Sequence, residues 1–322
     1  MKVLEMDNSI KLSIILITYN HEKYISDAIE RVLQQPIRDR YELLIGDDCS
    51  SDGTKEIISQ YAAKYPEIIK VVYHEKNVGA ARNIYDLLIQ TRGKYILRLE
   101  GDNYWEKTDQ IQKMIDFLDQ HEEFIGMAYQ SKTIDEETGD FIHVSKVDPR
   151  IKDNIATLKD FEKGHRIGCL FYRNFYREKE KDYSIIYTGG RMIAETTLLL
   201  LVLEHGKVYV TDKNWEVSRG GKRDKGASNY QSITKRQDIL EEWLHNAEVL
   251  QEYRPDLSLW SKKIFPAGEM LWDAVRVKDI KRVKVVLNRF SLKEKIILLI
   301  NLIKRVIRHS ALKLGKLVRV KS

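Results

Sequence analysis

Cysteines and long hydrophobic runs are scarce in this sequence, and both shortages exclude whole classes of protein. Cys49 and Cys169 are the only cysteines among 322 residues. Two cysteines cannot form the disulfide framework of a small secreted protein, so a reducing cytoplasm is expected, and neither is expected to be a catalytic thiol. Apolar runs such as IILI near Ile14 and IILLI near Ile296 fall short of the roughly 18 to 20 residues that span a bilayer.

An export signal is also missing from the N-terminus. No basic segment is followed there by an apolar segment and small residues, and LSIILITYN (12–20) reads as a first strand instead. We therefore expect a cytoplasmic protein that is peripheral to the inner face of the cell membrane.

Charge is spread unevenly along the chain, although the net charge is only +6. Residues 281–322 hold 13 lysines and arginines against the single acid Glu294, whereas the rest of the chain has 41 basic and 47 acidic residues. A basic appendage on an acidic body argues against nucleic acid as a partner. With 43% hydrophobic and 32% charged residues, the composition is that of an ordinary globular chain.

Apolar patterns in the first hundred residues alternate between strands and helices. Strands are expected at 12–18, 41–45, 69–73 and 94–99, with helices at 25–33, from 54 onward and at 79–90. Short connections between them predict an α/β fold with a mainly parallel sheet that helices cover on both faces. In such sheets ligands bind beyond the carboxyl ends of the strands.

Acidic residues follow two of these strands, in GDDCSSDGT (46–54) and YILRLEGDNYWEK (95–107). Carboxylates held at one rim repel one another by roughly 2–4 kcal/mol per close pair at an effective dielectric constant of about 20, so they require cations or donors. Hard oxygen ligands suit Mg²⁺ or Mn²⁺. A turn and helix cap before Thr54 is the alternative; it explains Asp52 but not acids on two separate strands.

Four motifs stand in the order TYN (18–20), GDDCSSDGT (46–54), NVGAARN (77–83) and GKYILRLEGDNYW (93–105). In order and spacing they resemble the family-2 glycosyltransferases of bacterial surface-polysaccharide type, over residues 11–130. The resemblance implies a GT-A (Rossmann-like) fold that binds a nucleotide sugar, and a divalent metal, Mn²⁺ or Mg²⁺, as cofactor.

The resemblance also implies roles for single residues. Tyr19 would lie along the uracil ring, and Asp47 or Asp48 would accept a hydrogen bond from the base or ribose. Asp102 would bind the metal directly, and Glu100 would share that site or face the ribose or sugar. The implied donor-binding set is Thr18, Tyr19, Asn20, Asp47, Asp48, Asn77, Arg82, Glu100, Gly101, Asp102 and Arg219.

Three of the residues near these motifs keep two interpretations each. Arg82 either meets the diphosphate or base, or is salt-bridged within its helix. Arg219 lies in VSRGG (217–221), which resembles a mobile loop that closes over the donor, but a solvated turn is the alternative. Trp105 either lines the sugar pocket or packs beside a helix start.

Sugar transfer also requires a base, because an acceptor hydroxyl has a high pKa. In RMIAETTLLLLVLEHGKVYV (191–210), Glu195 precedes an apolar helix, a glycine turn and a strand, and so stands at the position of the family's base. Glu195 is therefore the predicted catalytic base. An acid in the first turn of a helix also gains up to about 1 kcal/mol from the helix dipole, without any catalytic role.

Residues 1–225 are expected to form the catalytic domain, with a nucleotide-sugar half at about 11–130 and an acceptor half at about 131–225. Hairpin signals surround EETGD (136–140), and GCLFYR (168–173) resembles a second-domain strand of the family. Residues 226–322 are expected to be helical, with a basic tail.

The tail is expected to form one or two amphipathic helices. Its apolar face carries Ile296, Leu299, Ile300, Ile303, Ile307, Leu314 and Leu317. Such a helix can bind an anionic membrane surface with about 1 kcal/mol per nearby basic residue. The resemblance favours this interpretation, because it implies a lipid-linked acceptor. The alternative is a helix that packs on the catalytic domain with solvated lysines.

Together these observations predict an inverting, metal-dependent transferase. It would move a sugar from a nucleotide sugar, a UDP-sugar by expectation, to a hydroxyl of a growing surface glycan or lipid-linked glycan, as in capsule or lipopolysaccharide assembly. Inversion follows because a single displacement has no covalent intermediate. The alternative is a catalytically silent homologue that acts as a membrane-associated scaffold in polysaccharide assembly. The protein is compatible with either a monomer or a homodimer.

Overall fold

The structure is a computed structural model that describes residues 10–106, 108–176, 181–220 and 236–319, with side chains described as far as residue 308. The chain divides into two compact units, residues 1–234 and 235–322. The boundary predicted at 225/226 lies outside the described residues, as does Gly221 of the VSRGG motif.

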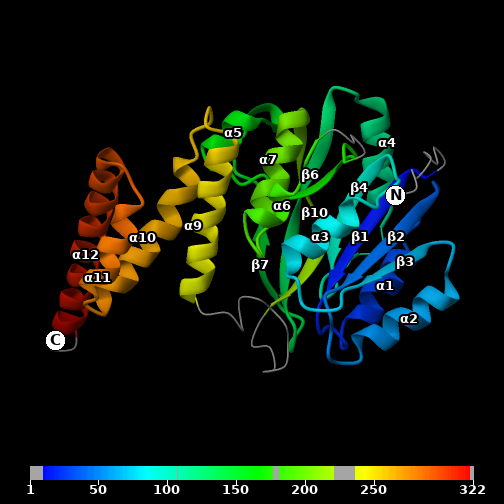
Figure 1. Cartoon of the computed structure of the whole chain (residues 1–322), viewed down its shortest axis with the longest axis horizontal. Helices are drawn as coiled ribbons and strands as arrows, with labels where there is room; N and C mark the ends of the chain where they lie inside the picture. The colour runs from blue at the N-terminus through cyan, green and yellow to red at the C-terminus, as the bar shows by residue number, and fades with distance from the viewer. Residues whose placement is uncertain (1–9, 107, 177–180, 221–235, 320–322) are drawn as a thin grey trace. The chain divides into compact units, whose positions relative to one another are not determined.

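Among the described residues, a ten-stranded sheet forms the middle of the first unit (Figure 1). Across the sheet its strands are β3 (Ile69–Tyr73), β2 (Tyr41–Asp47), β1 (Leu12–Thr18), β4 (Tyr95–Glu100), β9 (Cys169–Arg173), β6 (Phe124–Asp135), β10 (Lys207–Gly220) and β5 (Tyr104–Trp105). Off this path, β7 (Phe141–Ser145) pairs with β6 and β8 (Ile155–Ala156) pairs with β10.

The half of the sheet built from the first hundred residues is parallel, as predicted. β1 pairs in parallel with β2 and β4, and β2 pairs in parallel with β3. β9 pairs antiparallel with both β4 and β6, so the sheet as a whole is mixed. β2 and β4 extend beyond the predicted ends to Asp47 and Glu100, so each strand finishes on a carboxylate.

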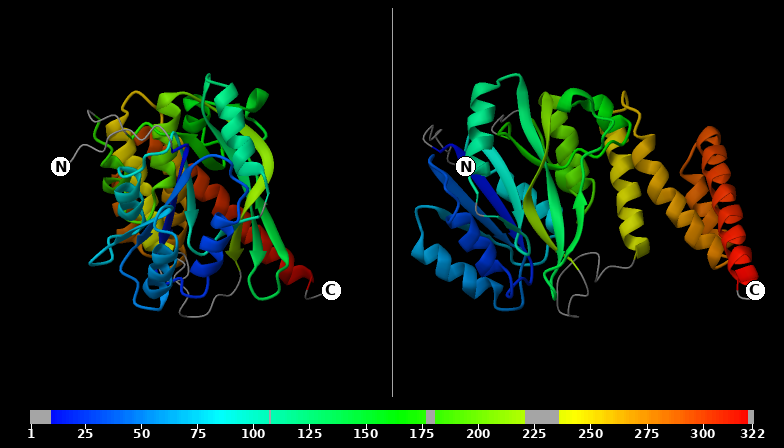
Figure 2. Two further views of the ribbon diagram at one scale, coloured as in Figure 1. Left: turned by 90° about the vertical axis from the view of Figure 1, so that its right-hand side faces the viewer. Right: turned by 180° about the vertical axis from the view of Figure 1, so that it is seen from behind.

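Helices cover both faces of the sheet (Figures 1 and 2). In the first unit they are α1 (Ile25–Leu33), α2 (Thr54–Lys64), α3 (Ala80–Leu88), α4 (Gln110–Gln120), α5 (Leu158–Glu162), α6 (Ile185–Thr188) and α7 (Glu195–His205), with a 3-10 turn at Lys152–Asn154. β1 is buried along its whole length, which is typical of a parallel strand with a helical layer on each side.

The predicted hairpin at EETGD is confirmed. β6 and β7 pair antiparallel, and the Asp135 amide donates to the Asp140 carbonyl at 2.7 Å. Gly139 has a φ of 73°, a backbone conformation that glycine adopts more readily than other residues.

The second unit consists of helices α9 (Arg236–Tyr253), α10 (Trp260–Arg276), α11 (Ile280–Asn288) and α12 (Leu292–Arg319). The predicted helical region and the helical tail are therefore confirmed. The unit has a core of its own, made by Leu240, Leu244, Ala267, Met270, Leu271, Val286, Phe290 and Leu298. In the described part of the chain, no helix combines the length and the apolar character that a membrane span requires.

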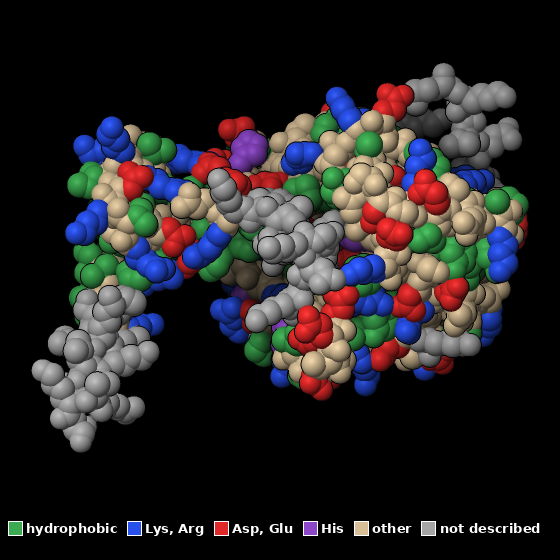
Figure 3. Space-filling model, turned by 90° about the horizontal axis from the view of Figure 1, so that it is seen from below, with side chains coloured by type: hydrophobic (Ala, Val, Ile, Leu, Met, Phe, Trp, Pro, Cys, Tyr) green, Lys and Arg blue, Asp and Glu red, His purple; other side chains and the backbone are tan. Residues whose placement is uncertain are grey.

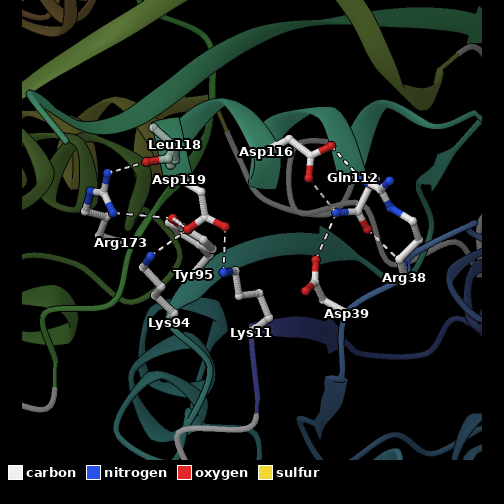
Figure 4. Close-up of polar contacts among 10 residues, drawn as sticks. All are labelled: Lys11, Arg38, Asp39, Lys94, Tyr95, Gln112, Asp116, Leu118, Asp119 and Arg173. Carbon is white, nitrogen blue, oxygen red and sulfur yellow. Dashed lines mark hydrogen bonds and ion pairs between the residues drawn. The ribbon is translucent and has the colours of Figure 1, made fainter. Parts of the chain in front are cut away.

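Charged contacts fasten α4 to the amino-terminal ends of β1 and β4 (Figure 4). Asp119 accepts hydrogen bonds from Lys94 at 2.6 Å and from the Tyr95 hydroxyl at 2.7 Å, and Lys11 lies 2.5 Å from its other oxygen. Burial raises the pKa of Asp119, but the hydrogen bonds from these three residues outweigh it and hold the pKa well below its usual range. Arg173 donates to carbonyl oxygens at the end of the same helix.

We predict that Asp119→Asn lowers the free energy of unfolding by about 1–2 kcal/mol at pH 7, because a neutral amide cannot replace an ionised partner of two lysines. Since the folded pKa is depressed, the contribution is full above about pH 4 and is lost as the pH falls further. Urea unfolding of both proteins at pH 7 and pH 3 should show the difference shrinking at pH 3.

Asp116→Asn is the matched control on the same helix. Asp116 pairs with Arg38, whose side chain is 71% exposed, and a pair of this kind contributes less than about 1 kcal/mol. An equal loss for the two variants, or a loss at Asp119 that does not depend on pH, would contradict the prediction.

Candidate active site

The carboxyl ends of β1, β2 and β4 meet at one edge of the sheet. In the strand register Thr18 lies opposite Asp47, and Ile17 lies opposite Glu100. The pairing of β1 with β4 continues one residue further, because the Gly101 amide donates a hydrogen bond to the Ile17 carbonyl at 2.8 Å. The structure therefore brings to one edge the predicted residues Thr18, Tyr19, Asn20, Asp47, Asp48, Glu100, Gly101 and Asp102.

The two aspartates at the end of β2 are buried and accept hydrogen bonds from the chain's own loops. Asp47 accepts hydrogen bonds from the Ser50 hydroxyl at 2.5 Å and the Ser50 amide at 3.2 Å. Asp48 accepts from the amides of Val78 at 2.6 Å and Gly79 at 2.9 Å. Burial raises the pKa of Asp48, and these two amides offset part of the rise. Asp48 thus clamps the NVGAARN segment to the end of β2.

The clamped segment in turn holds the chain that leads into α7. Gly79 has a φ of 91°, and a Cβ there would lie 2.6 Å from the Arg191 carbonyl oxygen. The Ala81 amide donates to that carbonyl at 2.9 Å, and the Arg191 guanidinium donates to the Asn77 carbonyl at 3.1 Å. α7 begins at Glu195, four residues after Arg191. These contacts of Arg191 therefore help to fix the position of the predicted base.

Gly101 separates the two carboxylates of the acidic motif because no side chain fits there. A Cβ at this position would lie 2.8 Å from Thr18 Oγ1 and 2.8 Å from His21 Nδ1. These two side chains are 3.1 Å apart, and His21 Nε2 lies 3.9 Å from the Asp102 carboxylate. The sequence interpretation missed His21, although it directly follows the TYN motif.

Arg98 connects the acidic motif with the predicted base, and it too was missed. Its guanidinium lies 2.9 Å from Glu100 Oε1 and 3.1 Å from Glu195 Oε1. A signal was present in the sequence, since Arg98 is the one charged residue before Glu100 in an otherwise apolar strand. Residues two apart in a strand lie on the same face, which places Arg98 beside Glu100.

Electrostatics at this edge favour a bound cation. Burial raises the pKa of Glu100 to about 7, Arg98 opposes the rise, and Asp102, Glu195 and Glu216 add to it. Among the described residues, no group of three or more His, Cys, Asp or Glu side chains is arranged as a metal site. Magnesium is, however, often held by one or two carboxylates together with substrate phosphates. Glu100 and Asp102 could supply the carboxylates of such a site. The residues present therefore fit a divalent ion shared with a substrate.

Glu216 is a further buried acid that the sequence interpretation missed. It belongs to β10, lies opposite Trp105 in the pairing with β5, and is 9% exposed. Its carboxylate accepts hydrogen bonds from the Tyr129 hydroxyl at 3.2 Å and from Asn103 Nδ2 at 3.4 Å, and burial raises its pKa. It follows Asn103 by 113 residues, so no local pattern marks it.

The two predicted arginines have different surroundings. Arg82 donates to both oxygens of Asp86, at 2.8 and 2.9 Å, and lies over the Tyr187 ring, so the salt-bridged alternative describes it in this structure. Arg219 donates to the Asp102 carbonyl oxygen at 2.7 Å and to Asp27 at 2.5 Å. Arg219 therefore lies beside the acidic motif, whereas Arg82 is held by its own helix.

The remaining predicted residues line the same loops. Asn20, with a φ of 53°, donates its amide to Ser50 Oγ at 2.9 Å, and Tyr19 precedes it directly after β1. Asn77 donates to the Asp48 carbonyl at 3.3 Å.

Trp105, in β5, is 3% exposed and belongs to the core cluster of the first unit. The structure therefore agrees with the alternative that Trp105 packs in the core.

The amino-acid sequence is similar to one family of known proteins. The family profile described as Glycosyl transferase family 2 matches residues 13–182. TuaG of Bacillus subtilis, named for teichuronic acid biosynthesis, is 35% identical over 165 residues, which cover 49% of this chain and 60% of TuaG. The chain spans 60% of the length of TuaG and between 19% and 45% of the length of several other curated relatives that it matches.

Solved structures agree on the fold. Staphylococcus aureus TarS 1–349 in complex with UDP-GlcNAc has a TM-score of 0.53 at 19% identity, over 86% of this chain and 90% of that one. The Pyrobaculum calidifontis mannosyltransferase PcManGT, in complex with GDP-Man and Mn²⁺, has a TM-score of 0.51 at 14% identity, over 96% of this chain and 82% of that one. The predicted GT-A fold is confirmed.

We predict that Asp48→Asn destabilises the protein by about 1–3 kcal/mol without any ligand. An amide side chain has one acceptor oxygen, so one of the two buried amides at Val78 and Gly79 loses its partner. Urea unfolding of the protein without nucleotide measures this loss.

Asp47→Asn is the matched control, because the Ser50 hydroxyl can rotate to accept a hydrogen bond from the new amide. We expect the control to lose less than half as much stability. Equal stability of Asp48→Asn and wild type would mean that Asp48 does not clamp the loop.

Proposed function

Because the chain belongs to glycosyl transferase family 2, we propose that it transfers a sugar from a UDP-sugar to an acceptor hydroxyl by an inverting single displacement. The acceptor we propose is a growing surface glycan or a lipid-linked glycan. The name of TuaG, for teichuronic acid biosynthesis, and the UDP-GlcNAc bound to TarS support this choice.

The observation that carries the proposal is the meeting of Glu100, Asp102 and Glu195 at the carboxyl edge. Glu195 is 54% exposed, at the first position of α7, and Arg98 joins it to Glu100. The Arg98 guanidinium thus contacts both the candidate base, Glu195, and the candidate donor-site acid, Glu100. In this arrangement an acceptor hydroxyl and a bound donor can be near one another.

In the proposed reaction the acceptor oxygen attacks the anomeric carbon while the bond to the diphosphate oxygen breaks. Glu195 accepts the acceptor's proton, a contribution of about 10²- to 10⁴-fold in rate. Glu100 and Asp102 would hold Mn²⁺ or Mg²⁺, which as a Lewis acid stabilises the charge of the leaving diphosphate. Within this proposal residues 11–130 bind the donor, residues 131–225 bind the acceptor, and residues 226–322 carry the basic tail.

We predict that Asp102→Asn abolishes Mn²⁺-dependent binding of UDP, whereas Glu195→Gln leaves that binding within about threefold and lowers the rate of UDP release by about 10²-fold or more. Asp102 would contact the donor's cation, and Glu195 would contact only the acceptor. Titration calorimetry with and without Mn²⁺, and a coupled assay of UDP release over a panel of nucleotide sugars, measure the two effects.

A scaffold protein without catalysis gives a different result in the same assays. It would bind UDP weakly with or without Mn²⁺ and release none from any sugar in the panel. Near-normal release by Glu195→Gln would mean instead that the base is another residue.

The second unit supports contact with an anionic membrane surface. One stripe of α12 is exposed, with Ile296 at 50%, Ile303 at 57% and Ile307 at 63% exposure. The opposite side of α12 contributes Leu298 to the core of the unit. Figure 3 shows hydrophobic, basic and acidic side chains intermixed on one face of the second unit. The side chains of Leu314 and Leu317, predicted for the same face, lie outside the described residues.

We predict that Ile296→Glu weakens binding to vesicles that contain about 30% phosphatidylglycerol by roughly 10-fold or more, because it places a negative charge in the apolar stripe. Cosedimentation measures the binding. Ile89→Glu in the first unit is the matched control, since both isoleucines are 50% exposed. Equal loss in both variants, or no binding by the wild-type protein, would argue against membrane contact through α12.

A further inference from the structure

Arg98 occupies an unusual position for an arginine, inside a strand whose neighbours are fully buried. Leu97 and Leu99, on either side of it in β4, are 0% and 1% exposed, whereas the Arg98 side chain is 24% exposed. One guanidinium nitrogen lies 2.9 Å from Glu100 and the other lies 3.1 Å from Glu195. A single guanidinium thus joins a strand end to the first residue of a helix far along the chain.

The two glutamates share this one counterion. Within the described ranges, Arg98 is the only cation within ion-pair distance of either Glu100 or Glu195. The planar guanidinium presents several N–H groups in a fixed fork, so it can hold two carboxylates at once in defined directions. A lysine ammonium is a point charge on a flexible stem and has no such fork.

We infer that Arg98 is a positioning residue, which fixes the Glu195 carboxylate relative to Glu100 and so holds the base beside the donor site. This inference rests on the proposed function, because it assigns Glu195 as the base. In a variant without Arg98 we expect α7 still to begin at Glu195, because the Arg191 contacts hold the preceding loop, whereas the Glu195 carboxylate would lose its only described ion pair. Because Asp102, and not Glu100, is the proposed direct metal ligand, the expected defect is larger in turnover than in donor binding.

The test uses the full chain with Arg98→Ala and Arg98→Lys. We expect Arg98→Ala to lower kcat by about 10- to 100-fold while KM for the nucleotide sugar changes less than about threefold. Methylguanidinium at millimolar concentration should restore part of the kcat, because it can occupy the vacated space between the two carboxylates. Arg98→Lys should keep the unfolding midpoint close to wild type and still lose turnover.

A purely structural role would lower the unfolding midpoint and would show no rescue, and that outcome overturns the inference. Unchanged kcat in Arg98→Ala overturns it as well, as does a KM for the donor that rises in parallel with the loss of kcat.

A second measurement does not depend on activity. The unfolding midpoints of Arg98→Ala, Glu195→Gln and the double variant form a double-mutant cycle, and we expect the shifts to be non-additive. Additive shifts would show that the two side chains are not paired, whatever the enzyme does. If wild-type protein released no UDP from any donor, the proposed function would fail, and a non-additive cycle would still establish the pair on which the positioning depends.

Discussion

Negative charge at the carboxyl edge of the sheet is the constraint on which the functional end of the first unit depends. Parallel pairing of β1, β2 and β4 brings the strand ends together, and β2 and β4 each end on a carboxylate. Each acid is then stabilised differently. Asp48 is held by two backbone amides, Glu216 by a hydroxyl and an amide side chain, and Glu100 by Arg98. The loops and helix starts that supply these partners are the parts that surround the candidate active site.

The two ends of the same strands differ in how well their charges are balanced. At the amino end, Asp119 has two lysines and a tyrosine hydroxyl, and its pKa is lowered. At the carboxyl end, Glu100 shares Arg98 with Glu195, and its pKa is raised. Full compensation fastens α4 to the sheet, whereas incomplete compensation leaves an electrostatic demand that a cation can satisfy. One sheet therefore has an end where charges are balanced and an end where they are not.

Local patterns in the sequence were enough to predict the first four strands, the helices between them and the edge of the sheet where the acids lie. Short apolar runs predicted β1 and β3 to the residue, and helical periodicity predicted α1 from Ile25 to Leu33, because a helix buries one face at regular spacing. The acids after β2 and β4 could be placed at one edge because parallel strands share a direction. The helical second unit, with its apolar stripe on α12, follows from the same periodicity.

Side-chain partners were decided only by the tertiary structure. Arg98 and Glu195 are far apart in the chain, and their pairing depends on how Gly79 and Arg191 dock the loop before α7. Glu216 reaches the site through the pairing of β10 with β5, which no local pattern encodes. Periodicity and motif spacing are properties of neighbouring residues, so the sequence by itself determined the strands, the helices and the edge where the acids gather. Ion pairs and buried acids depend on distances across the fold, so packing alone decided which charges share a partner.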